Sequence, residues 1–434
     1  MAEAGHIELG PFPDRPGYAT AQSLDGEDHL AGFRDRFFFD PEEPDMIYLD
    51  GNSLGRLPLT AREVTERLVD EQWGRGLIRS WNDGWWDLQV RLGDRLAAIV
   101  GAKSGEVIVS DSTSVNLYKL VMAAARGRTG RHKIVTDDLN FPTDLYVLDG
   151  VGRAFGDDHR LEVVASDGVE GPVDALERSI DEDTALVSLS HTVFKSGYTY
   201  DIESLTETAH RAGALILWDL SHSVGVIPIS LEESGADLAV GCTYKYLNGG
   251  PGSPAFLYVR EELQSQLENP ITAWWGHARP FDFELGFEPV EGIRRFHSGT
   301  MPIVSLALIE AGLNVVAEAG IGALRDKSQA LTQFLIEQWE EHLQPLGFEL
   351  ATPLDPSRRG SHVSLGHEEA WRITQAMIEA AQVLPDFRAP DNIRLGLAPL
   401  YTSFMDVHTA VQRIREVVET GTHLHFEHDR PSVT

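Results

Sequence analysis

Lys245 is the residue whose type and surroundings most favour covalent chemistry. It follows the apolar run Asp237–Cys242 by three residues and precedes residues 248–252, which read Asn-Gly-Gly-Pro-Gly. Glycine tolerates positive φ angles and lets the backbone approach a ligand closely. A lysine amine held there can form a Schiff base with an aldehyde. For Lys245 on its own, the alternative is a solvated lysine at the end of a strand.

The other lysines of the sequence are less suited to a buried Schiff base. One is predicted in a turn, one inside a helix, one at the start of a strand, one in a polar loop and one in a charged helix. In that order they are Lys103, Lys119, Lys133, Lys195 and Lys327. The sequence therefore points to Lys245.

Asp219 ends another apolar run, Ala214–Asp219, so its carboxylate is expected at the tip of a buried strand. A buried carboxylate is costly without a cation or a hydrogen-bond donor. Pyridoxal phosphate (PLP) offers a protonated ring nitrogen to such a carboxylate and an aldehyde to a lysine, and its ring withdraws electrons from a substrate carbanion. The alternatives are that Asp219 caps a following helix and that His222 is an ordinary core histidine.

Hydroxyl and aromatic side chains follow two further predicted strands. Residues 112–114 read Ser-Thr-Ser and precede a helix, where hydroxyls and free N–H groups form a phosphate site. Phe141 can stack on a pyridine ring, with the carboxylate of Asp144 close by in sequence. Taken singly, these residues are helix caps and a core phenylalanine. It is their common position, each just beyond a separate strand, that favours a cofactor site.

A parallel sheet must position these side chains. Short β-branched runs alternate with helical stretches, which is typical of βαβ units, and ligands bind at the carboxyl ends of the strands in such sheets. The predicted strands are Val107–Ser110, Lys133–Thr136, Ala185–Ser190, Ala214–Asp219, Asp237–Cys242 and Ala255–Val259. The predicted helices include Val115–Ala125 and Ile202–Ala212, the latter capped by Gly213.

A change of pattern near Ser305 predicts a second, smaller α+β domain. Long helices begin there, with Leu331, Phe334, Leu335 and Trp339 on one apolar face. The expected elements that follow are the strands Phe348–Ala351, His362–Leu365 and Ile393–Leu397 and the helix Val407–Val418. We therefore predict an N-terminal arm (residues 1–45) that contributes to the small domain, a large cofactor-binding domain (46–304) and a small C-terminal domain (305–434).

The composition is that of a globular protein and excludes several classes of partner. The 434 residues are 42% hydrophobic and 24% charged, which suits two folded domains. A net charge of -31 opposes nucleic-acid binding. The sequence contains no signal peptide and no apolar run long enough for a membrane span, so we expect a cytoplasmic protein. The single cysteine, Cys242, excludes an internal disulfide and a cysteine-based metal site.

The motifs around these residues resemble those of the kynureninase family of PLP enzymes, and the resemblance runs almost end to end. The matching stretches are YLDGNSLG (48–55), VNLYKLVMA (115–123), FPTD (141–144), WDLSHSVG (218–225), YKYLNGGPGSPAF (244–256), WWGH (274–277), SGTMP (298–302) and IRLGLAPLYTSF (393–404). Each motif alone is unspecific, whereas their joint order and spacing are specific. The resemblance implies an aspartate-aminotransferase-like α/β fold (fold type I). It also implies PLP as the cofactor and hydrolysis of L-kynurenine, or its 3-hydroxy form, to an anthranilate and L-alanine.

The resemblance also implies a role for each matched residue. Lys245 would carry the cofactor and act in catalysis together with Tyr244. The expected cofactor contacts are Thr113, Ser114, Phe141, Asp144, Ser190, Asp219, His222, Tyr244, Lys245, Trp274 and Thr300. Arg394 and Asn52 would bind the substrate, Arg394 through two parallel hydrogen bonds to the α-carboxylate. Trp274 and Thr300 would reach the site of a partner subunit, which implies a homodimer with the cofactor at its interface.

Two segments vary within the family. Thr300 stands where some members have Asn, and Arg79–Trp85 stands where some have a histidine-containing segment. These positions line the aryl pocket in the family. The sequence therefore leaves open the preference between kynurenine and 3-hydroxykynurenine, although the resemblance to bacterial members favours kynurenine.

Two rival functions share the expected fold. A cysteine desulfurase or selenocysteine lyase uses a mobile cysteine nucleophile, whereas Cys242 lies in a predicted strand. A PLP-binding transcription regulator needs a DNA-binding arm, and the sequence before residue 45 shows no helix-turn-helix pattern. The acidic composition also opposes DNA binding.

Overall fold

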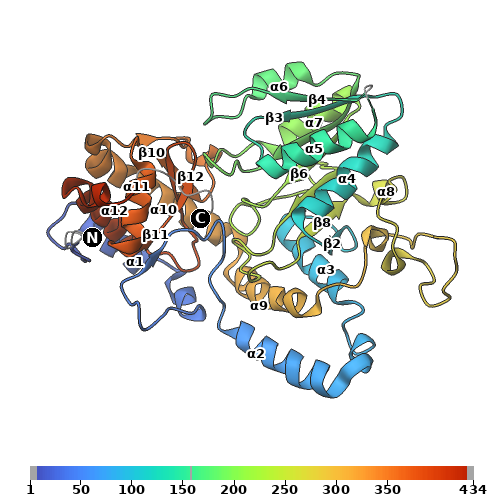
Figure 1. Cartoon of the computed structure of the whole chain (residues 1–434), viewed down its shortest axis with the longest axis horizontal. Coiled ribbons are helices and arrows are strands. Elements are labelled where there is room, and N and C mark those ends of the chain that lie inside the picture. The colour runs from blue at the N-terminus through green and yellow to red at the C-terminus, as the bar shows by residue number, and fades with distance from the viewer. Residues whose placement is uncertain (1–6, 157–158, 428–434) are drawn as a thin grey trace.

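A seven-stranded sheet forms the large lobe of the molecule, on the right in Figure 1. The computed structural model describes residues 7–156 and 159–427. The strands are β2 (Val107–Val109), β3 (Lys133–Asp137), β4 (Arg160–Val164), β5 (Thr184–Ser190), β6 (Leu215–Asp219), β7 (Leu238–Gly241) and β8 (Phe256–Val259). Their order is β2-β8-β7-β6-β5-β3-β4, and the pairs are parallel except those that involve β8. The predicted α/β fold with a mainly parallel sheet is confirmed.

Each predicted run of the large lobe forms a strand, and two features of the sheet differ from the prediction. Strand β8 runs antiparallel because residues 242–255, which join it to β7, contain no crossover helix. Strand β4 lies at the sheet edge, and four of its five residues are exposed or half-buried. An edge strand with so few buried positions lacks the apolar run by which the other strands are predicted.

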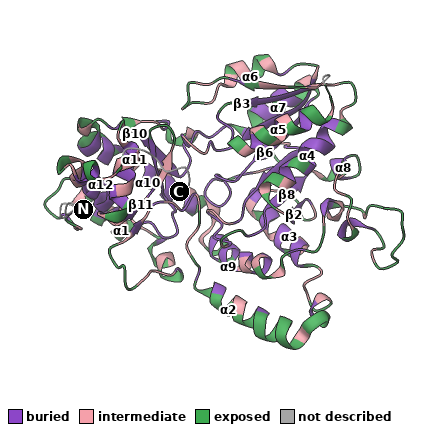
Figure 2. Cartoon of the chain, viewed as in Figure 1, coloured by how far each residue is buried: buried purple, intermediate pink, exposed green. Residues whose placement is uncertain are grey.

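Helices cover both faces of the large sheet, whose strands other than β4 are buried, as Figure 2 shows for the centre of the sheet. Ile216 and Trp218 of β6 pack into one apolar cluster, and Leu215 and Leu217 into another. One cluster includes residues of α3 (Leu88–Val100), α6 (Val173–Ser179) and α7 (Ile202–Ala212), and the other includes residues of α4 (Thr113–Gly127), α5 (Pro142–Ala154) and α8 (Glu261–Gln264). Gly213 ends α7 with a φ of 77°, as predicted for a C-cap.

A four-stranded antiparallel sheet forms the small lobe, on the left in Figure 1. Its order is β12-β13-β10-β9, with β9 (Glu349–Leu350), β10 (His362–Gly366), β12 (Asp386–Arg388) and β13 (Asn392–Gly396). Its helices are α1 (Tyr18–Glu27), α10 (Ile321–Gln338), α11 (Ala370–Glu379) and α12 (Phe404–Glu419), and β1 (Ile47–Tyr48) pairs with β11 (Val383–Leu384). The predicted apolar face at Leu331, Phe334, Leu335 and Trp339 packs in its core.

The chain crosses between the lobes near both ends. Ile7 and Ala21 pack in the core of the small lobe, whereas Leu30 and Phe37 pack in that of the large lobe. Helix α9 (Ile303–Ala319) packs on the large lobe before α10 returns to the small one. The domain boundaries after residues 45 and 304 stay predictions. Among the described residues no single helix could span a membrane, and only α9 taken with Ile321–Leu346, across an 82° bend, has the length and composition.

The remaining elements are short helical segments. Helix α2 (Thr60–Glu66) continues as a π-helix (Arg67–Gly76) and a 3-10 turn (Leu77–Trp81), and this arm is largely exposed in Figure 2. The other segments are Ala31–Arg36, Trp274–Gly276, Ile293–Phe296, Trp339–Leu343, Gln344–Leu346, Pro356–Arg358 and Thr422–His425.

Candidate active site

The loop after β7 holds Lys245 at the carboxyl end of the sheet, as predicted. The N–H of Gly249 donates to the carbonyl of Thr243 (2.8 Å), and the N–H of Asn248 donates to the carbonyl of Lys245 (2.9 Å). Asn248 adopts a φ of 54°, in the left-handed region. These bonds hold the backbone of the lysine in a tight turn.

The amine of Lys245 faces two other predicted site residues. Its Nζ lies 3.0 Å from Nε2 of His222 and 6.0 Å from the centre of the Phe141 ring. Burial lowers the pKa of Lys245, so the neutral amine is populated at lower pH than in an ordinary lysine. A neutral amine is the form that attacks an aldehyde.

Burial alone does not distinguish Lys245 from the other lysines, contrary to what their positions in the sequence indicate. Lys119, Lys133 and Lys327 are buried more deeply. Each of them is neutralised by a carboxylate: Lys119 pairs with Asp111, Lys133 with Asp181 (2.7 Å) and Lys327 with Asp28 (2.7 Å). The polar contact of Lys245 is instead a histidine, which leaves its amine available for reaction.

Asp219 and Asp144 form a buried pair of carboxyl groups beside Lys245. Asp219 ends β6, and its Oδ1 accepts hydrogen bonds from the N–H (2.9 Å) and Oγ–H (2.6 Å) of Ser221. Residues 221–226 form turns, so Asp219 caps no helix. Burial raises the pKa of both carboxyls, and the charge of Asp219 raises that of Asp144 further. The protonated form is therefore favoured more strongly at Asp144 than at Asp219.

Ser190 and His222 also lie in this site. Ser190 ends β5 directly beside Asp219 and donates from Oγ to Oδ1 of Asn140 (2.6 Å). His222 is buried, and burial together with the charge of Lys245 lowers its pKa well below the usual value. A neutral His222 can accept a proton or a hydrogen bond from the lysine.

The predicted phosphate site lies at the start of α4. Oγ of Ser112 accepts from the N–H of Val115 (3.4 Å), so Ser112 is a structural N-cap. The helix begins at Thr113, which is half-buried, and Ser114 is exposed. The hydroxyls of Thr113 and Ser114 thus stand in the first turn of a 15-residue helix, where the helix dipole favours an anion.

Arg394 lies in the small lobe on β13, fully buried. Its guanidinium donates to the carbonyl of Phe194, to Oγ of Ser53 (2.8 Å) and to the carboxylate of Asp386. With its amide oxygen turned toward the guanidinium, Asn52 accepts from Nε at 2.8 Å. The predicted substrate-binding residues Asn52 and Arg394 are therefore in contact.

The remaining predicted cofactor contacts lie further from the groups around Lys245 or are more exposed. They are Tyr244, Trp274 and Thr300. Tyr244 is half-buried beside Cys242, and the cysteine together with burial raises the pKa of its hydroxyl. The ring of Trp274 contacts those of Trp86, Trp275 and Phe281 and is 42% exposed. The side chain of Thr300 is exposed as well. This exposure leaves both residues free to meet another molecule.

Three residues that lie in the site were not predicted from the sequence. His362 on β10 is buried, with its ring centroid 5.9 Å from that of His222. Asp386 and Arg388 on β12 form an ion pair at 2.5 Å next to Arg394. The three-residue strand β12 gives no periodic signal, and a lone histidine at the start of a strand indicates a core position.

The matched motif 48–55 packs directly on the loop after β7 that holds Lys245 (the lysine loop). The N–H of Gly55 donates to the carbonyl of Tyr244 (2.8 Å). A Cβ at residue 55 would lie 2.4 Å from the carbonyl oxygen of Lys245 and 2.3 Å from Oδ1 of Asn248. Only glycine allows this approach.

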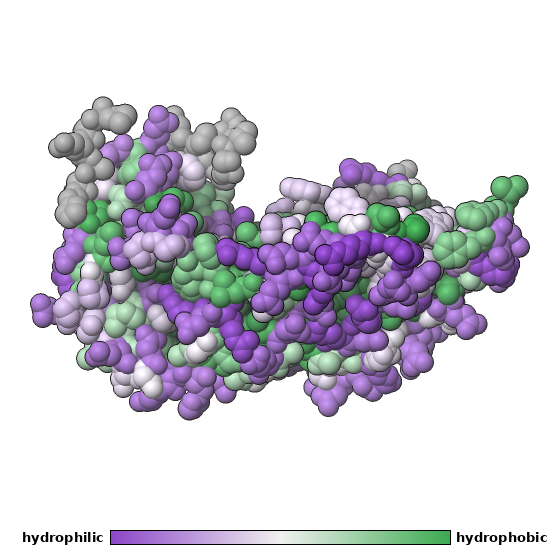
Figure 3. Space-filling view, turned by 90° about the horizontal axis from the view of Figure 1, so that it is seen from below, coloured by the Kyte–Doolittle hydropathy of each residue, from purple (hydrophilic) through white to green (hydrophobic). Residues whose placement is uncertain are grey.

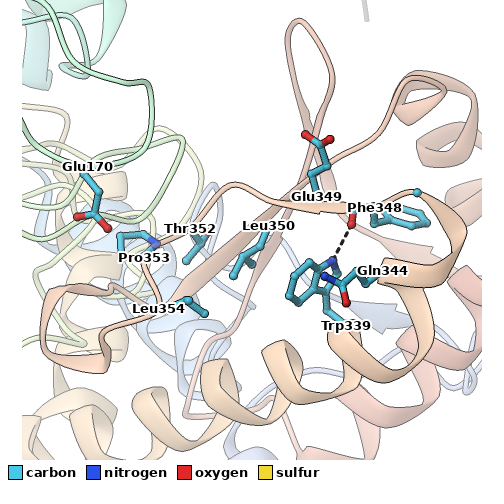
Figure 4. A pocket seen from close by; sticks show the side chains of 10 residues that line it. Glu170, Trp339, Gln344, Phe348, Glu349, Leu350, Thr352, Pro353 and Leu354 are labelled. Atoms are coloured by element: carbon cyan, nitrogen blue, oxygen red, sulfur yellow. Dashed lines mark hydrogen bonds between the residues drawn. The ribbon is translucent and has the colours of Figure 1, made fainter.

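A separate pocket lies mainly in the small lobe. It measures about 650 Å³ and is lined by Glu170 and by residues between Trp339 and Leu354, as Figure 4 shows. The indole N–H of Trp339 donates to the carbonyl of Phe348 (3.1 Å), so this donor is already used. The ionisable groups among its lining residues are the carboxylates of Glu170 and Glu349. None of the predicted site residues lines the pocket, so volume does not identify the active site here.

The residues around Lys245 fit PLP. Oδ2 of Asp144 is buried and receives no hydrogen bond from a neighbouring donor. Asp219, buried beside it, has a pKa raised by burial, which a cationic ring N–H would reverse. Among the described residues no carboxylate forms an ion pair with the amine of Lys245, which faces an aromatic ring. An aldehyde on a protonated pyridine ring satisfies each of these groups.

Relatives with curated names match nearly the whole chain. The kynureninase of Pseudomonas fluorescens is 45% identical over 405 residues, which cover 92% of this chain and 95% of that protein. The kynureninase of Burkholderia pseudomallei is 44% identical with the same coverage. Residues 324–414 match the family model described as the kynureninase C-terminal domain.

Solved structures match the fold at low sequence identity. The apo structure of a cysteine desulfurase from Thermococcus onnurineus NA1 has a TM-score of 0.78 at 20% identity and covers 90% of this chain and 98% of that one. A C-DES mutant with glycine covalently linked to its PLP cofactor has a TM-score of 0.76 at 17% identity, covering 88% and 98%. These structures show the shared fold. The curated relatives, at far higher identity over almost the same length, show that this chain belongs to the kynureninase family.

Proposed function

We propose that this protein uses PLP, attached through Lys245, to hydrolyse L-kynurenine to anthranilate and L-alanine. The observation that carries the proposal is the amine of Lys245. It forms no ion pair with a carboxylate in the described part of the chain, and it lies in the site that also holds the paired carboxyls of Asp219 and Asp144. The 45% identity to a kynureninase supports this substrate.

The bound cofactor would supply an electron sink for negative charge at the substrate Cα. Asp219 would keep the proton on the ring nitrogen, because an ionised carboxylate buried beside that nitrogen favours its charged form. Phe141 would lie against the ring, and Thr113 and Ser114 would hold the phosphate. Asp144, protonated, would hold Asp219 in place through a hydrogen bond.

Lys245 and Tyr244 would move protons. The lowered pKa of Lys245 favours the neutral amine, which would accept the Cα proton, and Nε2 of His222, 3.0 Å from Nζ, can share that proton. The raised pKa of Tyr244 keeps its hydroxyl protonated, so it acts as a donor. Arg394 would fix the α-carboxylate, which orients the Cα–H bond toward the lysine.

Fluorescence of released anthranilate tests the proposal. Purified protein supplied with PLP is expected to convert L-kynurenine, and parallel assays with 3-hydroxy-L-kynurenine would measure the preference that the sequence leaves open. L-cysteine serves as the third substrate, with sulfide as the readout for a desulfurase. Cys242 is buried and burial raises the pKa of its thiol, which opposes that activity. Sulfide release without anthranilate would overturn the proposed function.

The contact between Gly55 and the lysine loop makes a sharp prediction. Gly55→Ala is expected to lower kcat/KM for L-kynurenine by at least about tenfold, because a displaced loop misplaces the amine. The matched control is Gly26→Ala in α1, where a Cβ would meet nothing within 4 Å. The control is expected to match the wild type in steady-state assays and in retained PLP. Equal activity of the two variants would show that the loop does not depend on this contact.

We also propose that the active protein is a homodimer in which Trp274 and Thr300 serve the partner's site. Large apolar side chains are exposed on two segments of the chain: Trp73, Leu77 and Ile78 in the arm that follows α2, and Phe281, Phe283 and Leu285 in the loop of residues 279–287. Figure 3 shows hydrophobic surface at the projecting tip on its right, the side on which the loop of residues 279–287 lies in Figure 1. Exposed apolar surface of this extent is typical of an interface.

Mixing two inactive variants tests the shared site. One chain carries Lys245→Ala, and the other carries Trp274→Ala together with Thr300→Ala. Each heterodimer would contain one intact site, so random exchange of subunits is expected to restore about a quarter of the wild-type activity. Activity that stays at the level of the separate variants, although exchange is confirmed by mass, would contradict the shared site.

A further inference from the structure

Asp386, Arg388 and Arg394 lie on one face of the small sheet. Strands β12 and β13 are antiparallel neighbours, and Asp386 is paired directly with Arg394 in their register. Arg388 is two residues beyond Asp386, so its side chain points to the same face. The face therefore carries two cations with the carboxylate of Asp386 between them, and the carboxylate of Asp50 lies 4.0 Å from Nη2 of Arg394.

Arg394 has almost no free hydrogen-bonding capacity. Its guanidinium has five N–H groups. Four acceptors already use them: the amide oxygen of Asn52, the carbonyl of Phe194, Oγ of Ser53 and the carboxylate of Asp386. A carboxylate ligand bound through two parallel hydrogen bonds needs two N–H groups. One of the four present acceptors must leave before such a ligand binds.

Asp386 is the acceptor best able to leave. Asn52 and Ser53 are neutral and belong to the motif that packs on the lysine loop, and Phe194 contributes a backbone carbonyl. The carboxylate of Asp386 already has a second cation, with Nη2 of Arg388 at 2.5 Å. Arg388 also has a spare donor, because its Nε is buried without a hydrogen-bond partner. Asp386 can thus leave Arg394 and remain neutralised.

Arg388 is placed to bind the carboxylate of Asp386 after it leaves Arg394. The Arg388 side chain is 32% exposed and lies over the ring of Phe194, which in turn contacts the ring of Phe141. Burial is the main cause that lowers the pKa values of Lys245 and Arg394, and the charge of Arg388 lowers both further, so Arg388 acts on the same site. A second cation beside Arg394 lets the site hold two carboxylates at once, the one from Asp386 and the one from a ligand.

We propose that Asp386 occupies Arg394 in the free enzyme and passes to Arg388 when the substrate α-carboxylate takes its place. Asp386 and Arg388 are then positioning residues that set the affinity for amino-acid carboxylates. The inference rests on the proposed function only for the identity of the substrate. The exchange itself applies to any α-amino acid that the site binds.

Calorimetric titration of the PLP-loaded protein with L-alanine tests, without turnover, whether a ligand carboxylate replaces that of Asp386 on Arg394. Asp386→Asn removes the competing charge and keeps the side-chain shape, so the Kd for L-alanine is expected to fall about three- to tenfold. Arg388→Gln leaves Asp386 with Arg394 as its cation and is expected to raise the Kd by a similar factor. Asp391→Asn, at an exposed position beyond the same strand, is the matched control and should match the wild type.

The double variant and a kinetic measurement complete the test. Because the role of Arg388 requires the charge of Asp386, Arg388→Gln is expected to have little effect in the Asp386→Asn background. With L-kynurenine, Asp386→Asn should lower KM more than it changes kcat. A higher Kd for Asp386→Asn, or additive effects in the double variant, would overturn the exchange. If L-alanine binds as expected in all variants but no anthranilate is released from L-kynurenine, only the proposed function is overturned.

Discussion

Lys245→Ala is expected to abolish turnover of L-kynurenine, with a loss in kcat of at least about a thousandfold. The variant removes the amine that would carry PLP and accept the Cα proton, and each of these roles contributes a factor of this order. The visible absorbance band of the lysine-bound cofactor should vanish, and hydride reduction followed by mass spectrometry should find no cofactor attached to the chain.

Two controls separate this chemistry from a loss of structure. Lys103→Ala removes a surface lysine that pairs with Glu232 at 3.3 Å, and it is expected to retain full activity and the absorbance band. Added methylamine should restore part of the activity of Lys245→Ala, because a small amine can occupy the space left by the side chain. A Lys245→Ala protein that kept the band and the turnover would contradict the assignment.

Asp219→Asn is expected to lower kcat by about a hundred- to a thousandfold. An amide cannot stabilise a proton on the ring nitrogen as a buried carboxylate does, and breaking a buried ion pair costs about 3–5 kcal/mol. The absorbance and fluorescence of the bound cofactor should change as well, because its ring would be neutral. Near-ultraviolet circular dichroism of the two proteins would report any change in the fold.

Asp144→Asn is the matched comparison for Asp219. Burial and the neighbouring charge raise the pKa of Asp144 well above its usual range, which favours its neutral form. A neutral amide therefore resembles the native group, and we expect a loss of about tenfold or less, the value of one neutral hydrogen bond. Equal losses in the two variants would mean that the charge of the pair is not located on Asp219.

Much of the large lobe could be predicted from local pattern. The strand that ends at Asp219 and the helix Ile202–Ala212 follow from β-branched runs, helical periodicity and the C-cap glycine Gly213. In a parallel sheet, the carboxyl ends of all the strands lie at one edge. Placing each reactive group just after a strand was therefore enough to predict that Asp219 and Lys245 would meet.

The tertiary structure decided which groups are in contact and which charges are neutralised. Lys119 and Lys245 both lie in buried surroundings, but only the packing of Asp111 against Lys119 shows which amine is left reactive. The partners of Arg394 come from β12 and from Asn52 and Ser53, far away in the chain. The sequence by itself determined the type, order and strand position of the reactive residues, because periodicity is a local property. Contacts between distant residues depend on strand register and on the packing of the two lobes, which local periodicity does not encode.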